Sequence, residues 1–112
     1  MLYTDDELQN MRFEFSRALE AANRRIDRNL EQHQLQDIYF DVEPQLTKLS
    51  EVVWKIPNDS AWNESFTTAY NAVDEGAQWL SYAMGASDDD RPGYLDTTKG
   101  HLLRAVEALA MS

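Results

Sequence analysis

Apolar residues recur at spacings of three and four along most of the chain, which is the pattern of amphipathic α-helices. Thr4 and Glu7 form the Ser/Thr-x-x-Glu sequence of a helix-opening capping box. The apolar positions that follow it are Leu8, Met11, Phe15, Leu19, Ala22, Ile26 and Leu30. This unbroken stripe predicts one long, straight first helix over residues 5–33.

Two further apolar stripes follow at similar spacing. Proline is tolerated in the first turn of a helix, so Pro44 is consistent with a second helix over residues 42–56. A turn then places Asp59 or Ser60 at the N-cap of a third helix, predicted over residues 61–84. The connections are short, and successive helices joined this way are antiparallel neighbours.

The C-terminal part begins with a polar stretch over residues 86–93, which we expect to be a loop. Asp96 or Thr97 then caps a fourth helix over residues 97–110. No segment of useful length alternates apolar and polar residues, so no β-strand is expected. The sequence therefore predicts a single all-α domain over residues 1–112, an antiparallel bundle of about four helices.

The third helix carries a second stripe of small and aromatic residues, Ala72, Gly76, Trp79 and Ala83. A helix that is apolar on two faces lies at the centre of its own bundle or at a subunit interface. Gly costs roughly 1 kcal/mol of helix propensity relative to Ala, so a close approach of another backbone is expected at Gly76. We take these four residues as a candidate homo-oligomer interface, with the intrachain alternative open.

Composition restricts the class of protein. The chain has 112 residues, 43% of them apolar, which is enough for one core. It contains no Cys, so disulfides and Cys-metal sites are excluded. No signal peptide or membrane-spanning apolar run is recognisable, and we expect a cytoplasmic protein. A net charge of −10 disfavours direct binding to nucleic acid.

Half of the basic residues fall in one short segment, residues 12–28, which holds five arginines against three acids. This segregation favours local binding of an anion by a protein that repels nucleic acid in general. A row of guanidinium groups suits phosphate or carboxylate. The predicted ligand-binding residues are Arg17, Arg24, Arg25 and Arg28. The alternative is a solvated helix face with ion pairs such as Glu20–Arg24.

Arg28 and His33 have the Arg-x4-His spacing and the polar residue after Arg that resemble the HEPN ribonucleases. The resemblance implies His33 as general acid or base and Arg28 as the group that stabilises the phosphate. His33 also continues the apolar stripe, so a partly buried core histidine is the alternative. Asp88–Asp90 begin a calcium-like pattern, but Lys99 stands where the loop needs Glu. We expect no metal and no cofactor.

The segment Val73-Asp74-Glu75-Gly76-Ala77-Gln78-Trp79, which runs on to Ala83-Met84-Gly85, resembles the second helix of the helical-hairpin domain in phage anti-CBASS and anti-Thoeris sponge proteins. The resemblance covers about residues 45–85. It implies a non-enzymatic oligomer that sequesters cyclic nucleotide or cyclic ADP-ribose signals, with Gly76 and Trp79 on the oligomer-forming face. The Tyr-His segment that binds the ligand in that family is not matched in this chain.

These observations give three hypotheses for function. The first is a phage or mobile-element counter-defence factor that sequesters an anionic, nucleotide-like ligand or blocks a host defence protein. The second is an acidic nucleic-acid mimic that inhibits a nucleic-acid-binding protein through the acids outside residues 12–28. The third is a HEPN-like ribonuclease.

Overall fold

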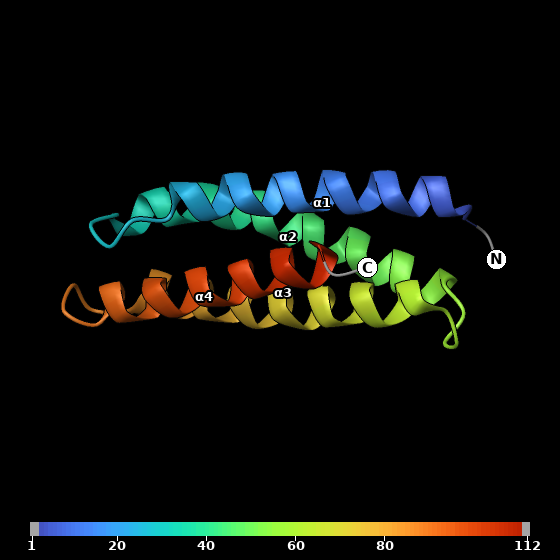
Figure 1. Cartoon of the computed structure of the whole chain (residues 1–112). Helices are drawn as coiled ribbons and strands as arrows, with labels where there is room; N and C mark the ends of the chain where they lie inside the picture. The colour runs from blue at the N-terminus through green and yellow to red at the C-terminus, as the bar shows by residue number, and fades with distance from the viewer. Residues whose placement is uncertain (1–2, 111–112) are drawn as a thin grey trace.

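The computed structural model describes residues 3–110, and these residues form four α-helices without a strand. The helices are α1 (Asp5–Arg25), α2 (Gln32–Lys55), α3 (Ala61–Gly85) and α4 (Arg91–Ala110) (Figure 1). The predicted all-α bundle of four helices is confirmed. The two residues at each end of the predicted domain lie outside the described residues.

Successive helices run antiparallel, so the α1–α2 and α3–α4 connections lie at the same end of the bundle, on the left of Figure 1. The α2–α3 turn lies at the other end. The bundle is elongated, with extents of 47 × 20 × 20 Å. Contacts are most extensive between α3 and α4 and least extensive between the neighbours α1 and α2.

The apolar stripes of all four helices meet in one continuous core. Each helix contributes fully buried side chains to it, including Leu19, Leu49, Phe66 and Leu102. Phe15 and Phe66 pack edge to face across α1 and α3, with ring centroids 6.2 Å apart. The 3.6-residue periodicity of the sequence thus identifies the buried face of each helix correctly.

The first helix begins as predicted and ends earlier. The Thr4 hydroxyl accepts the Glu7 N–H and the Glu7 carboxylate accepts the Thr4 N–H, both at 3.1 Å. The predicted end at residue 33 is wrong, because α1 stops at Arg25 and Ile26 is extended. Asp27 then accepts the Asn29 N–H at 2.8 Å in a side-chain turn. Ile26 lies in the loop after α1, but its side chain is buried in the core, so the apolar stripe of the sequence continues beyond the end of the helix.

The second helix begins ten residues before its predicted start at residue 42, at Gln32. The Glu31 N–H donates to the Gln34 side chain at 2.9 Å, which defines the N-terminus there. Pro44 therefore lies inside α2 and not in its first turn. The Pro44 ring is exposed to solvent. The backbone hydrogen bond that α2 lacks at this position is therefore missing on the solvent side of the helix and not on the core side.

The third helix matches its prediction, with Ser60 as N-cap accepting the Trp62 N–H at 3.2 Å. The fourth helix begins at Arg91 and not at residue 97, so the predicted loop over 86–93 is too long. Pro92 is the second residue of α4. Backbone N–H groups in the first turn of a helix have no acceptor within the helix, so a proline there costs no helical hydrogen bond. Within residues 3–110 no helix has the length and apolar character needed to cross a membrane.

Candidate ligand-binding groove

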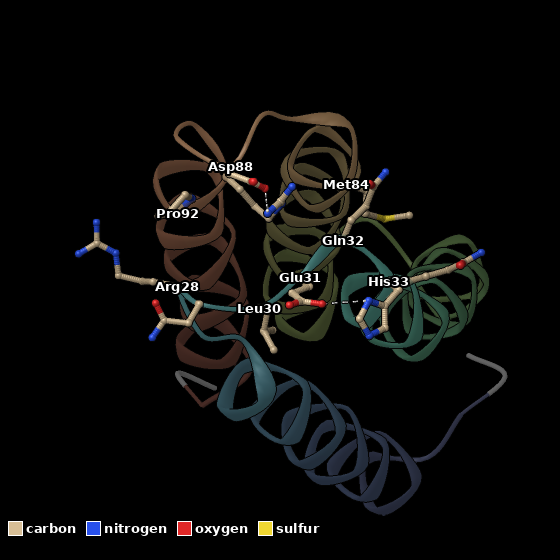
Figure 2. A pocket seen from close by; sticks show the side chains of 11 residues that line it. Arg28, Leu30, Glu31, Gln32, His33, Met84, Asp88 and Pro92 are labelled. Carbon is tan, nitrogen blue, oxygen red and sulfur yellow. Dashed lines mark hydrogen bonds and ion pairs between the residues drawn. The ribbon is translucent and has the colours of Figure 1, made fainter.

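A polar groove opens at the end of the bundle where the α1–α2 and α3–α4 connections meet (Figure 2). Its volume is about 970 Å³, and it is widely open to solvent. The lining residues are Arg28, Asn29, Leu30, Glu31, Gln32, His33, Gln36, Met84, Asp88, Arg91 and Pro92. Arg28 of the α1–α2 connection and Arg91 at the start of α4 therefore both line one groove.

Arg91 is the fixed basic group of the groove. Its side chain is only 12% exposed. Nη1 donates to the Asp88 carboxylate at 2.8 Å and Nη2 donates to the Ala86 carbonyl at 3.2 Å. Nε is buried and has no hydrogen-bond partner among the described residues. The first residue of α4 thus positions a guanidinium group whose hydrogen-bonding capacity is not filled.

Arg28 belongs to the α1–α2 connection, and its side chain is 67% exposed. Its Nε lies 3.5 Å from the Asp96 carboxylate, which is a weak, solvent-exposed pair. In Figure 2 its guanidinium points away from Glu31 and His33. Arg28 therefore stands at the rim of the groove, with its guanidinium group directed outward.

The first turns of α2 and α4 both contribute to the lining, through Gln32, His33, Arg91 and Pro92. A helix N-terminus carries a partial positive charge, which favours anions. Three acids compensate this charge in the first turn of α1, whereas the first turns of α2 and α4 contain no acid. Glu31 and Asp88, which precede these two helices, supply the negative charge of the groove instead.

His33 lies in the first turn of α2, five residues after Arg28 in the connection, so the two are not on one helix as predicted. Both line the groove. The His33 side chain is 76% exposed, and its Nδ1 lies 3.5 Å from the Glu31 carboxylate. The alternative of a partly buried core histidine is therefore wrong.

The other predicted ligand-binding arginines lie on α1 and do not line the groove. Arg25 forms an exposed ion pair with Asp41 of α2. Arg17 and Arg24 are exposed and form no ion pair within residues 3–110, so the expected Glu20–Arg24 pair is absent there. Because α1 ends at Arg25, the predicted helical stripe does not extend to Arg28.

The structure places the predicted interface stripe of α3 against α4 of the same chain. Ala72, Gly76 and Ala83 are buried, and Trp79 is half-buried. A Cβ at Gly76 would lie 3.2 Å from the Leu102 side chain, so the close approach is to a side chain. Trp79 packs against Tyr94 of α4 with ring centroids 5.5 Å apart. Intrachain packing thus accounts for the second apolar stripe of α3.

Arg91 was not among the predicted site residues, because the polar composition of residues 86–93 predicts a loop there. The Pro92 that follows was the available signal, since proline is favoured in the first turn of a helix. In the described part of the chain, no group of three or more His, Asp or Glu side chains is placed to hold a metal ion.

Comparisons with models of known protein families, with curated proteins and with solved structures find no match to this chain. The groove combines the held guanidinium of Arg91, the rim residue Arg28, two helix N-termini and a short apolar wall.

Proposed function

We propose that the protein is a non-enzymatic binding protein that holds a small anionic, nucleotide-like ligand in the groove at the end of the bundle. The observation that carries this proposal is that Arg28 and Arg91 line one groove of about 970 Å³. Ligand pockets in proteins range over about 300–1,000 Å³. Because this groove is open to solvent, a molecule of nucleotide size fills part of it and stays partly exposed.

Arg91 offers N–H donors to an anion that replaces the Asp88 carboxylate. Asp88, which pairs with Arg91, has a side chain that is 94% exposed. This carboxylate is therefore accessible to solvent, and a phosphate can replace it as the acceptor of the Arg91 Nη1 hydrogen bond. Arg28 supplies the second positive charge: it leaves its exposed ion pair with Asp96 and pairs with the ligand. Guanidinium groups bind phosphate in a bidentate manner, which gives directionality as well as charge.

The groove also has an apolar part, formed by Leu30, Met84 and Pro92. All three are half-buried and belong to different segments of the chain. A planar base is mostly apolar on its faces, and flexible methionine adapts to such a surface. Gln32 and Gln36 line the same groove and offer both donors and acceptors to a base edge. The lining thus suits a ligand with one charged and one flat apolar portion.

For the biological role we propose sequestration of a signalling nucleotide by a phage or mobile-element counter-defence factor. The sequence of residues 45–85 resembles the helical hairpin of phage sponge proteins, and α2 and α3 form an antiparallel hairpin over this range. A sequestering protein needs affinity and abundance and no catalytic group. The polar groove and the acidic surface are compatible with that role.

Calorimetric titration with a cyclic dinucleotide and with cyclic ADP-ribose tests the proposal. We expect binding of at least one of them, weakened at least about tenfold by Arg28→Glu, which reverses a charge of the groove. Arg17→Glu is the matched control, since Arg17 is exposed on α1 and outside the groove. Equal losses in both variants would show that general electrostatics, and not the groove, attracts the ligand.

The same proteins, incubated with a single-stranded RNA, distinguish sequestration from catalysis. We expect no cleavage by the wild-type protein. Cleavage that His33→Ala abolishes would overturn the non-enzymatic proposal, because His33 and Arg28 line the same groove. Failure of both nucleotides to bind at millimolar concentration would reject the nucleotide-like ligand.

A further inference from the structure

The outer face of α2 exposes two large aromatic side chains. Trp54 is 86% exposed and Phe40 is 60% exposed. They are 14 positions apart, which is about 21 Å along a helix axis and about 40° around it. Thr47 and Glu51 lie between them on the same face, and both are exposed. The two rings therefore mark the ends of a straight strip along α2.

Tryptophan is a highly buried residue on average and is enriched at the centres of protein–protein interfaces. No ring contact is formed by Trp54 or Phe40 within the described residues, whereas Trp62 and Trp79 are half-buried against other rings. Packing inside the bundle therefore accounts for the other two tryptophans and not for Trp54.

The strip is also acidic. Glu43 and Glu51 lie within about 60° of Phe40 around the helix, between the two rings. The lysines of α2, Lys48 and Lys55, lie about 80° and 60° from Phe40 and about 120° and 100° from Trp54, on the flank of the strip away from Glu43. The chain as a whole carries a net charge of −10. A second copy and an anionic membrane are both repelled by this surface, whereas a basic partner is attracted.

Pro44 adds a polar contact point to the strip. It has no N–H, so the Phe40 carbonyl lacks the donor that a helix normally supplies four residues later. Phe40 and Pro44 are both exposed, so this oxygen is on the solvent side of α2. A lysine or arginine from a partner can donate a hydrogen bond to it.

We propose that the outer face of α2, from Phe40 to Trp54, docks a basic amphipathic helix of a partner protein. A helix of about four turns spans the distance between the two rings and lies along α2. Its apolar residues cover Phe40 and Trp54, and its basic residues face Glu43 and Glu51. This surface belongs to residues outside the groove, so the inference is independent of the proposed ligand.

A synthetic Leu/Lys amphipathic peptide of about four turns is the probe, titrated at about 0.15 M ionic strength. We expect the double variant Phe40→Ala, Trp54→Ala to bind this peptide at least about tenfold more weakly than the wild-type protein. The matched control is Phe13→Ala, Leu103→Ala, which removes two exposed apolar side chains from α1 and α4. The control should bind like the wild-type protein.

Two results would overturn the inference. Equal affinity of both double variants would show that the peptide binds by charge alone, without the aromatic strip. Sedimentation that shows a wild-type dimer, lost in Phe40→Ala, Trp54→Ala, would identify a second copy as the occupant. All four substituted positions are exposed, so circular dichroism should show the same helix content in every variant. Nucleotide binding in the groove is unchanged in these variants if the two surfaces are independent.

Discussion

At the scale of single residues, the glycines of α3 and α4 show how one residue type meets two different surroundings. A Cβ at Gly76 would lie 3.2 Å from Leu102 and 3.4 Å from His101. Gly100 lies inside α4, is exposed and would have nothing within 4 Å of an added Cβ. Helix propensity alone favours replacing either glycine by a residue with a side chain. Packing against α4 opposes the replacement at Gly76 and not at Gly100.

We therefore expect Gly100→Ala to raise the free energy of unfolding by roughly 1 kcal/mol, since it adds helix propensity without a contact. Gly76→Leu should lower it by about 1–3 kcal/mol, because the added atoms force α4 away from α3. Urea unfolding measures both. A stabilising Gly76→Leu would mean that α3 and α4 do not pack closely at this point.

Sequence could predict the close approach at Gly76, because a glycine inside a strong helical stripe requires a reason. It could not say whether α4 or a second subunit supplied the neighbour, since both present apolar side chains. The role of Arg91 was harder to predict, because it depends on hydrogen bonds to the Ala86 carbonyl and the Asp88 carboxylate. The polar composition around it also gave little sign that a helix begins there.

At the scale of helices, the boundaries depend on contacts between segments distant in the sequence. Lys99 of α4 donates to the carbonyls of Asn23 and Ile26, at 2.9 and 3.0 Å. These carbonyls belong to the end of α1, which carries partial negative charge. Periodicity continues through Ile26 and Leu30 and predicts a longer helix. It contains no information about a lysine more than 70 positions away.

Lys99→Met should therefore destabilise the protein by about 1–3 kcal/mol, since two carbonyls lose a charged donor. The control is Lys48→Met, an exposed position on α2, with an expected change within about 0.5 kcal/mol. Urea unfolding gives the free energies, and amide hydrogen exchange should show faster exchange in the last turn of α1. Equal effects of the two substitutions would contradict the capping role of Lys99.

Pro44 inside α2 is the second departure from the prediction at this scale. Proline costs about 3 kcal/mol in a helix interior, so Pro44→Ala should stabilise the protein by up to that amount in urea unfolding. The substitution also gives the Phe40 carbonyl a helical donor, so binding of the Leu/Lys peptide should weaken. A loss of stability would show that α2 needs its proline to follow the curvature of the core.

At the scale of the whole molecule, the fold was more predictable than the site. Four apolar stripes with short connections permit few arrangements other than an antiparallel bundle. The groove is formed by two connections, and its geometry follows from where four helices end. Three of those ends depend on contacts of Asp27, Glu31 and Lys99 that the sequence alone did not specify, whereas Pro92 did signal the start of α4.

Net charge is the property of the whole chain with the most direct consequence for stability. At about 0.01 M salt the screening length is about 30 Å, longer than the 20 Å width of the bundle, so the net charge of −10 repels itself across all helices. The ion pairs Arg25–Asp41 and Arg28–Asp96 join different segments of the chain, but both are exposed and compensate little. Added salt should therefore stabilise this protein rather than weaken it.

We expect Tm to rise between about 0.01 M and 0.1 M NaCl, where the screening length falls to about 10 Å. Each kcal/mol of repulsion removed corresponds to roughly 4–8 °C in a domain of this size. The variant Glu14→Gln, Glu107→Gln neutralises two exposed acids on α1 and α4, so it should melt higher than wild type at low salt and show a smaller rise. A Tm that falls with salt would mean that the exposed ion pairs outweigh the repulsion, because screening would then remove net attraction.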